Sequence, residues 1–475
     1  MQVKQEDIMR LFTAVAGAAS RASGVWRQSF EWLEAEAPKF SLSGSQVRVL
    51  RSPSEFYETL LERSRNAHRR VTLASLYLGT GPLAARLAET LNARMQEAPS
   101  LRLRVLLDFT RASRGELNSR TLLLPLRAKG GQVALYHTPE LRGLVRMLLP
   151  QRWNEVVGLQ HMKIYLFDDS VIVSGANLSD DYFTNRQDRY VLIDDCPSLS
   201  NFLDGLVSTV SDFSFQLTQD NQTVLAPNWK FHPFNSPRSK FVDAAGQHVS
   251  TFYQQWLRQS AADTTQLDTV IYPLIEMRQL GVGNDCRVTK RLIASAPANA
   301  CVTLSTGYFN LTDEYSKCVI DSGADFDILM AHPSANGFLG ARGAAGGIPH
   351  AYTLLAHRFR LKLAALGQQL RVRLREYQRQ DWTYHAKGLW YQHQPDIKPE
   401  MTLIGSPNFG ERSTVRDLEL QLILATTNEG LKSQLTEEVQ DLKMSTTVFP
   451  ENLDVAQRST PLWVRMVVFL CKKFF

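Results

Sequence analysis

The sequence predicts an α/β protein made of two similar sandwich domains that a pseudo-twofold axis relates. Three observations support this prediction. Short apolar strands alternate with helical stretches, the same order of strands occurs twice, and a His-x-Lys sequence follows the strands in each repeat. Strands that alternate with helices form mainly parallel sheets, because a helix usually connects two parallel strands. The 475 residues are enough for about two to four domains.

Each half is expected to contain three apolar strands separated by helices. The paired strands are expected at 70–82 and 301–312, at 103–111 and 325–333, and at 132–139 and 370–377, with helices such as 83–96 and 351–366 between them. The first strand of each half leads into a glycine-containing turn. Chance similarity explains any one of these pairs, but not their shared order and spacing. The chain therefore contains an internal duplication.

We assign residues 40–213 to the first domain and residues 271–460 to the second. The stretch between them, 214–270, is polar and contains several prolines, so we expect a linker with a peripheral helix near 248–260. The composition agrees with folded domains, since 44% of the residues are hydrophobic and 21% are charged.

Composition also excludes several classes of protein. The chain has no run of about 18 apolar residues, which excludes a polytopic membrane protein. Its five cysteines form no C-x-x-C pair, which argues against a disulfide scaffold or a structural zinc site. The net charge of +6 favours anionic partners, among which phosphate, nucleotide, acidic lipid and nucleic acid remain open at this point.

The two ends, residues 1–39 and 461–475, differ from the rest of the chain. Residues 8–30 contain no Asp or Glu and carry three arginines and three serines, as mitochondrial presequences do; an ordinary surface helix is the alternative. The C-terminal segment extends only about 22 Å as a helix, which is too short to span a bilayer. Its aromatic and basic residues suit a helix lying in a membrane interface, with a terminal helix docked on the core as the alternative.

The first candidate motif runs from His161 to Asn177. Alternation in the sequence MKIYLF predicts a strand, so His161 and Lys163 point to the same face. A turn that begins at Asp168 leads into a second strand, VIVSG. We expect this hairpin to bring Asn177 back beside His161.

The second candidate motif has the same design in the other half. His385 and Lys387 begin a strand, and the sequence MTLIGSPNFG supplies the returning strand with Ser406 and Asn408 at its end. The tip of this hairpin carries a longer polar insertion than the first. Two such units in equivalent positions are a much stronger signal than one His-x-Lys sequence.

These residue types suit substitution at a phosphodiester or pyrophosphate. A neutral imidazole can attack phosphorus and form a phosphohistidine, while a second imidazole moves the proton of the leaving or entering oxygen. Lys163 and Lys387 place positive charge beside the phosphate oxygens, and Asn177, Asn408 and Ser406 donate hydrogen bonds. The sequence shows no cluster of carboxylates that would hold a metal, so we expect no metal and no cofactor for the chemistry.

Together the two motifs resemble those of the phospholipase D superfamily, and the resemblance covers nearly the whole chain. It implies two phospholipase D-like α/β sandwich domains with the active site, and both histidines, at their interface. It also places Asp168 in the catalytic motif. The second motif departs from the family pattern, because Gln392 stands at the equivalent position. We therefore expect the motif aspartate to have a structural role.

The resemblance further implies that Asp188 and Glu419 orient the two imidazoles. They lie in the matching sequences NRQDRYVLI and VRDLELQLI, and surface carboxylates on strands are the alternative. We expect His161 to be the nucleophile and His385 the general acid and base, with the reverse assignment as the alternative.

Longer strings resemble the eukaryotic phosphatidylglycerophosphate synthases, among them residues 158–190, 306–312 and 402–413. This resemblance implies transfer of the phosphatidyl group from CDP-diacylglycerol to glycerol 3-phosphate, with release of CMP, as the committed step of phosphatidylglycerol and cardiolipin synthesis. It also implies a mitochondrial enzyme that lies peripherally on the anionic surface of the inner membrane. The sequence leaves open whether divalent cations help, for instance by a non-catalytic effect through the lipid.

The acceptor carries a phosphate dianion, so cationic side chains are needed near the site. For this phosphate or that of CMP, the candidates are Arg111, Arg114, Arg120, Arg186 and Arg412, with solvated surface arginines as the alternative. The Gly- and Ala-rich segment 337–352 fits a lid, a lipid-facing loop or a structural loop.

Two other functions remain open from the sequence. A phospholipase D-like hydrolase would use water as the acceptor, and a degenerate membrane scaffold would perform no chemistry. A nuclease would favour a continuous basic groove with aromatic residues for stacking, whereas the arginines here are scattered, so no nucleic-acid partner is expected.

Overall fold

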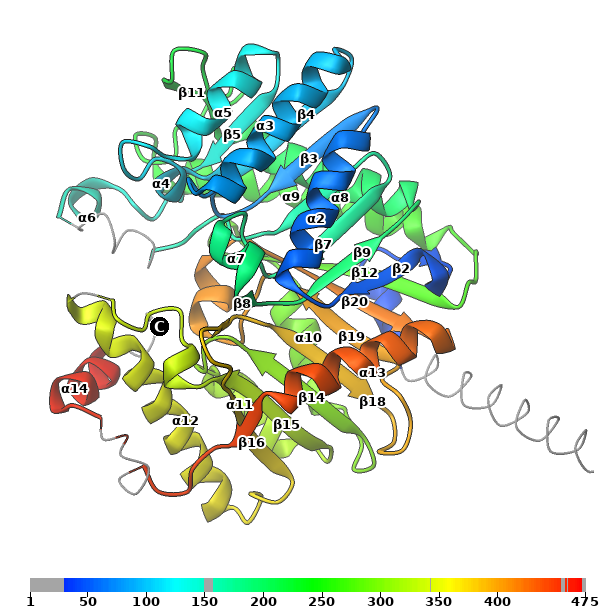
Figure 1. Cartoon of the computed structure of the whole chain (residues 1–475), viewed down its shortest axis with the longest axis vertical. Coiled ribbons are helices and arrows are strands. Elements are labelled where there is room, and N and C mark those ends of the chain that lie inside the picture. The colour runs from blue at the N-terminus through cyan, green and yellow to red at the C-terminus, as the bar shows by residue number, and fades with distance from the viewer. Residues whose placement is uncertain (1–29, 149–156, 342, 454–457, 459, 472–475) are drawn as a thin grey trace, which may run out of the picture.

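The computed structural model describes residues 30–148, 157–341, 343–453, 458 and 460–471, and it contains two large mixed β-sheets with helices around and between them (Figure 1). The sequence predicts an α/β fold, and this prediction is confirmed. The predicted presequence at 8–30 lies almost entirely outside the described residues. Among the described helices, none combines the length and the apolar character that a membrane span requires.

The first sheet is built from residues of the first half. From edge to edge it contains β11 (Thr223–Leu225), β10 (Phe215–Leu217), β5 (Gln132–Tyr136), β4 (Arg102–Asp108), β3 (Arg70–Ala74), β6 (Ile164–Phe167), β7 (Ser170–Ser174), β9 (Tyr190–Ile193) and β2 (Val47–Leu50). The three central strands β3, β4 and β5 are parallel, and the pairs on either side of them are antiparallel.

The second sheet repeats this order. From edge to edge it contains β1 (Phe40–Leu42), β12 (Thr269–Met277), β20 (Glu419–Thr426), β19 (Met401–Gly405), β18 (Gly388–Gln392), β14 (Cys301–Thr306), β15 (Asp325–Ala331), β16 (Val372–Tyr377) and β21 (Thr446–Val448). Strands β14, β15 and β16 are parallel, and β13 (Val282–Gly283) pairs with β12. Read from β2 and from β12, the two sheets match over eight strands, so the duplication read from the sequence is present, and β11 and β1 are additional edge strands.

The expectation of mainly parallel sheets was wrong in one respect. In each half the motif hairpin, β6–β7 or β18–β19, joins the sheet antiparallel to the first strand of the parallel set. Two strands joined by a tight turn run antiparallel, because parallel strands need a long crossover connection, so the hairpin ends the parallel arrangement. Each sheet is consequently mixed.

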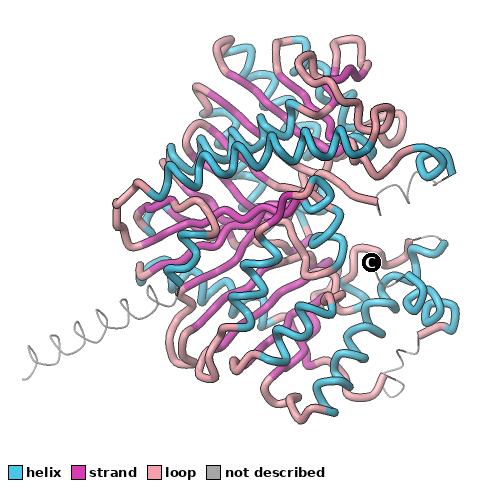
Figure 2. Tube along the Cα trace, turned by 180° about the vertical axis from the view of Figure 1, so that it is seen from behind, coloured by secondary structure: helices cyan, strands magenta, loops and turns pink. Residues whose placement is uncertain are grey.

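The helices form three layers around the two sheets (Figures 1 and 2). The first sheet packs its outer face on α2 (Pro53–Asn66), α3 (Pro82–Glu97) and α5 (Ser119–Ala128). The second packs its outer face on α10 (Asp285–Ala294), α11 (Asp313–Asp321) and α12 (Ile348–Ala365). A central core shared by both halves contains α8 (Pro197–Asp212), α9 (Arg238–Ala261) and α13 (Glu429–Met444).

Local sequence explains where these helices begin. Ser52 caps α2 by accepting a hydrogen bond from the Glu55 N–H, and Pro53 occupies the first turn, where its missing N–H costs nothing. Helix α13 begins in the same way, because Asn428 accepts from the Leu431 N–H. The apolar faces of both helices then bury against the sheets, which contributes most of their stability.

Two boundaries differ from those expected. The segment 214–270 is more than a linker, because β10 and β11 extend the first sheet beyond β5 and α9 is much longer than the expected helix at 248–260. Strand β1, expected in the first domain, pairs with β12 in the second sheet. Strands of three residues are too short to show a periodic pattern, which is why the sequence does not reveal them.

The C-terminal segment begins with α14 (Leu462–Cys471). Val464 and Val468 are buried in the core of the second half, whereas Leu462 and Met466 are exposed. The docked helix, given as the alternative, is therefore observed for one face of α14, and the membrane-interface interpretation stays a prediction. One face docks on the core, and the other presents apolar side chains outward.

Candidate functional site

Both motif histidines lie where the two halves meet, and each is held there by the opposite half. The backbone N–H of His161 donates to the carbonyl of Leu418 at 2.9 Å, and that of His385 donates to the carbonyl of Gln187 at 2.8 Å. A small parallel sheet of β8 (Arg186–Gln187) and β17 (Thr383–Tyr384) also joins the halves. The interface thus fixes the positions of both imidazoles.

Each imidazole also takes its carboxylate partner from the opposite half. His161 Nδ1 lies 3.0 Å from both carboxylate oxygens of Glu419, and His385 Nδ1 lies 2.6 Å from Asp188 Oδ2. Both carboxylates are buried. A carboxylate that accepts the Nδ1 proton fixes the tautomer in which Nε2 carries the lone pair. The carboxylates expected as orienting groups thus occupy that position.

Burial controls the protonation of the site. It holds the pKa of His161 and that of His385 well below the ordinary value, and the adjacent lysine ammonium lowers each further. Burial also raises the pKa of Asp188 to about 6 and lowers that of Lys387 to about 8. Near pH 7 the site therefore holds neutral imidazoles beside an ionised carboxylate and a charged lysine.

The two lysines occupy matching positions. Lys163 Nζ donates to the carbonyl of His161 at 2.6 Å, and Lys387 Nζ donates to that of His385 at 2.7 Å. Lys387 Nζ also lies 3.7 Å from Asp188 Oδ2. Both side chains are buried, and burial lowers the pKa of Lys163 well below its ordinary value. An anionic phosphate beside the two lysines would favour their ammonium forms and interact strongly with them in a medium of low dielectric constant.

The two Nε2 atoms have different surroundings. His161 lines a pocket whose other residues are Tyr308, Asn310, Tyr352, Asn408, Gly410, Arg412, Ser413 and Asp417. Among the described residues nothing bonds to His161 Nε2, whereas His385 Nε2 lies 3.2 Å from the hydroxyl of Tyr182 and 3.1 Å from Lys387 Nζ. His161 therefore carries the more accessible lone pair.

The asparagines lie at the ends of the two motif hairpins, as expected. Asn408 lines the same pocket as His161, and its side-chain oxygen accepts from the Thr306 hydroxyl at 3.2 Å. The side-chain oxygen of Asn177 is buried without a hydrogen-bond partner among the described residues. A buried polar atom left without a partner in a protein indicates a site for a ligand or water.

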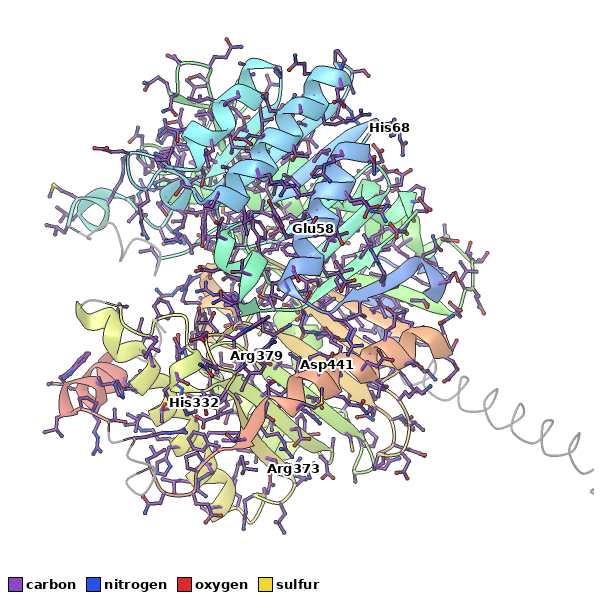
Figure 3. The ribbon with its side chains drawn as sticks, viewed as in Figure 1. Glu58, His68, His332, Arg373, Arg379 and Asp441 are labelled. Atoms are coloured by element: carbon purple, nitrogen blue, oxygen red, sulfur yellow. The ribbon has the colours of Figure 1, made fainter. Side chains whose placement is uncertain are left out.

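Two motif residues have structural positions, which was expected for Asp168 but not for Ser406. Ser406 is buried and donates to the Glu419 carboxylate, so it supports an orienting group and does not face substrate. Asp168 lies in the turn at the other end of β6 from His161, in the left-handed region at φ 53°. Its carboxylate accepts backbone N–H groups of residues 68–70, and His68 marks this outer edge of the first half in Figure 3. In the second half, Gln392 instead donates to Ile397 O.

The five arginines divide between the site and its surroundings. Arg412 lines the pocket and lies 3.2 Å from Asp417, and Arg186 lies 3.2 Å from Asp181 beside Tyr182. Arg120 donates to the carbonyl of Asn221 in the β10–β11 hairpin, so it holds the edge of the first sheet. The remaining two, Arg111 and Arg114, follow β4 and do not line this pocket.

Sequence reasoning missed Asp417. One of its carboxylate oxygens accepts from the Leu159 N–H at 3.1 Å and the other from Arg412. Asp417 stands two residues before Glu419, at the position that Arg186 occupies before Asp188. Matching these two sequences residue by residue would have identified this difference.

Asp417 also completes a group that could hold a metal ion. His161, Asp417 and Glu419 place one possible ligand atom each within 4.8 Å of one another. In the observed arrangement the Glu419 carboxylate is bonded by His161 and Ser406, and that of Asp417 by an amide and a guanidinium. In the observed arrangement these carboxylates therefore serve as acceptors for protein donors.

Known proteins of similar sequence share one description. The chain is 45% identical to the "CDP-diacylglycerol--glycerol-3-phosphate 3-phosphatidyltransferase, mitochondrial" of Homo sapiens over 94% of its own length and 86% of that protein. It is 34% identical to the probable enzyme of the same description from Dictyostelium discoideum, over 93% and 79% of the two chains. No protein-family model matches the chain.

A solved structure supports the fold. The phosphatidylserine synthase of Haemophilus influenzae superposes with a TM-score of 0.71 at 19% identity, covering 94% of this chain and 99% of that one. At this identity the likeness shows a common fold, and the sequence relatives show the family. The chain belongs to the family of CDP-diacylglycerol–glycerol-3-phosphate 3-phosphatidyltransferases.

Proposed function

We propose that this chain transfers the phosphatidyl group of CDP-diacylglycerol to a hydroxyl of glycerol 3-phosphate through a covalent phosphohistidine on His161. The names of its relatives supply the reaction. The observation that supports the covalent step is the orientation of His161, whose Nδ1 is held by Glu419 while the ring lines the pocket.

In the first step His161 Nε2 attacks the phosphorus that carries diacylglycerol. The N–P bond forms and the bond from that phosphorus to the oxygen of CMP breaks. CMP leaves as a phosphate, so charge neutralisation matters more than proton donation, and the buried ammonium groups of Lys163 and Lys387 supply it. Glu419 stabilises the positive charge that develops on the phosphorylated imidazole.

In the second step a hydroxyl of glycerol 3-phosphate attacks the same phosphorus. His385 takes the hydroxyl proton on Nε2, the O–P bond forms and the N–P bond to His161 breaks. The lowered pKa of His385 keeps this imidazole neutral at pH 7, so its Nε2 lone pair carries no proton. The protonated His385, stabilised by Asp188, then releases the proton to solvent.

Arg412 and Arg186 are proposed to bind the phosphate of the acceptor. Arg412 lines the pocket beside His161, and Arg186 lies beside Tyr182, which contacts His385. Arginine suits this role because its planar fork can donate two parallel hydrogen bonds to one phosphate. Loss of either side chain is expected to raise KM for glycerol 3-phosphate more than KM for CDP-diacylglycerol.

We propose that the chemistry needs no metal and that divalent ions act only by bridging the protein to anionic lipid. The protein donors that occupy the Asp417 and Glu419 carboxylates support this proposal. In detergent micelles without anionic lipid, excess EDTA should leave turnover unchanged. Inactivation by EDTA there, with recovery on one specific ion, would instead identify a metal site at His161, Asp417 and Glu419.

We also propose a peripheral location on the mitochondrial inner membrane. Several relatives carry the word mitochondrial in their names, and the described residues contain no helix suited to span a membrane. After cell fractionation the protein should sediment with inner membranes and be released by alkaline carbonate. Retention in the carbonate-resistant pellet would contradict a peripheral attachment.

The test of the reaction is CMP release by the purified chain in detergent micelles, with and without glycerol 3-phosphate. We expect acceptor-dependent release that yields phosphatidylglycerophosphate and disappears in His161→Ala. CMP release that is indifferent to the acceptor would identify a hydrolase built on the same residues. Absence of release from a folded wild-type chain would contradict the proposed function.

A further inference from the structure

Exposed apolar side chains gather on two short helices, one in each half. Helix α6 (Gly143–Leu148) exposes Leu144, Met147 and Leu148, the last at 71%. Helix α14 exposes Leu462, Trp463 and Met466, the first at 81%. Both helices protrude on the same side of the molecule, at the left in Figure 1 and at the right in the reversed view of Figure 2. We refer to these six side chains as the apolar rim.

The apolar rim is connected to the catalytic site through the second half. In the first half, helix α6 precedes His161 in the sequence. In the other half, Gly337 packs against Arg186 and Tyr308 of the site, and Gly347 packs against the ring of Trp463. The segment 337–347 therefore runs from the wall of the site to α14, and Leu339 within it is exposed.

The residues beside the apolar rim carry positive charge. The ranges 143–148 and 462–471 contain Arg146 and Arg465 and no acidic residue. Both arginines are exposed, and Lys472 and Lys473 follow in the sequence. The nearest carboxylate before α6, that of Glu140, is paired with Arg238 at 2.8 Å. Helices whose exposed side chains are apolar and basic, with no acidic residue of their own, complement an anionic lipid surface.

We propose that the apolar rim is a two-part membrane-docking surface, with α6 and α14 both inserted in the headgroup region of an anionic bilayer. The proposal rests on the proposed function, since it gives the lipid substrate a route. The diacylglycerol tails stay in the bilayer while the headgroup enters between the halves beside His161. Two contacts, one from each half, hold the mouth of the site against the membrane.

The test compares paired substitutions in each helix with a matched control. The variants are Leu144→Asp with Met147→Asp in α6, Leu462→Asp with Met466→Asp in α14, and Leu370→Asp as the control. Leu370 is 85% exposed, and it lies beyond the far end of α12 from Gly347, roughly 27 Å away along that helix. All these positions except Leu370 belong to the apolar rim, and none is in the catalytic machinery.

Binding is measured by co-sedimentation with phosphatidylcholine vesicles that contain phosphatidylglycerol. Each double substitution should weaken binding by at least about tenfold, because it removes buried apolar area and adds negative charge. The Leu370→Asp control should bind as wild type does. Release of CMP from a short-chain, soluble CDP-diacylglycerol should stay within about twofold of wild type in every variant.

Two results would overturn the proposal. One is unchanged vesicle binding in both double variants. The other is a wild-type dimer that these substitutions dissociate while vesicle binding persists, which would assign the apolar rim to a second copy of the chain. Failure of the proposed function has a different signature, since the wild-type chain would then bind vesicles through the apolar rim but release no CMP from the soluble substrate.

Discussion

The two motif histidines have the same partners but different surroundings. His161 and His385 each have a buried carboxylate on Nδ1 and a buried lysine two residues on. Around His161 the neighbours are a second carboxylate, Asp417, and an open pocket. Around His385 they are Arg186 and two tyrosine rings, Tyr182 and Tyr308. A duplicated site has thus become asymmetric.

This difference supports the different roles proposed for the two equivalent histidines. A nucleophile needs an accessible lone pair and a counterion for the cation that forms, and His161 has Glu419 and Asp417 beside it. A base needs to be neutral at the working pH and correctly oriented, and His385 is kept neutral by its lowered pKa and oriented by Asp188 and Tyr182. In this proposal the electrostatic surroundings, rather than the motif, determine the two roles.

The largest expected effect comes from removing the nucleophile. His161→Ala should lower turnover by at least about 10⁵-fold, because no other described group in the pocket can form the covalent intermediate. Steady-state CMP release measures this effect, and far-ultraviolet circular dichroism checks that the variant is folded. An alanine variant that keeps a tenth of the activity would contradict the role of His161 as the nucleophile.

Substitution of the two orienting carboxylates should separate the two steps. Glu419→Gln should slow formation of the phosphohistidine by about 10²–10⁴-fold, because the wrong imidazole tautomer is then favoured. Asp188→Asn should slow transfer to the acceptor by a similar factor while the first turnover of CMP persists. Rapid-quench measurement of the CMP burst distinguishes them, and equal loss of the burst in both variants would show that the sites are equivalent.

The pH dependence tests the His385 side of the comparison. Asp188, whose pKa burial raises to about 6, loses its charge as the pH falls below that value, so the rate should fall about tenfold per pH unit on the acid side. Lys387, whose pKa burial lowers to about 8, loses its charge as the pH rises above it, so the rate should also fall on the alkaline side. The plot of kcat/KM for glycerol 3-phosphate against pH should be bell-shaped, and Asp188→Asn should remove the fall in rate on its acid side.

One contact in this region has no counterpart in the other half. Arg189, which follows Asp188, is buried, pairs with Glu438 of α13 at 2.9 Å and stacks on Trp390, whereas Leu420 follows Glu419. Glu438→Gln should lower the free energy of unfolding by about 3–5 kcal/mol, because it leaves a buried guanidinium without its counterion.

Chemical denaturation measures this loss of stability. The neighbouring substitution Glu437→Gln is the control, since its exposed pair with Arg51 should contribute at most about 1 kcal/mol. Equal stability of the two variants would contradict the idea that Arg189 anchors the His385 side through α13.

The smallest expected effect is that of Tyr182→Phe. Its hydroxyl lies 3.2 Å from His385 Nε2 and orients the base without being essential for proton transfer. Losing one such hydrogen bond should slow acceptor-dependent turnover by about tenfold. The CMP burst should be unchanged, since His161 does not contact this hydroxyl. A reduced burst with normal acceptor transfer would reverse the roles assigned to the two histidines.

The sequence predicts most of the fold because its signals are local. The three parallel strands in each half are short apolar runs bounded by glycine or charged residues, and each motif hairpin has the period of a strand. Strands β10 and β11 were not predicted, because each has only three residues and they are recognised by their pairing beyond β5 in the first sheet. Likewise, the transfer of β1 to the second sheet depends on long-range pairing with β12.

The same limit applies to the site. The repeated motif identifies the histidines and lysines, because their spacing within a strand fixes which side chains share a face. It does not reveal that Glu419 contacts Nδ1 of His161 and that Asp188 contacts Nδ1 of His385, because these contacts between opposite halves arise from the packing of one half on the other. It also does not separate Ser406, which faces a carboxylate, from Asn408, which faces the pocket.

The division of labour is tested most directly by trapping the intermediate. CDP-diacylglycerol labelled with ³²P at the phosphorus that carries diacylglycerol is mixed with His385→Ala and, separately, with His161→Ala. We expect His385→Ala to retain acid-labile, alkali-stable label on His161, and His161→Ala to retain none. Label on His385 in the His161→Ala variant would contradict the account, because it would show that the asymmetry runs the other way.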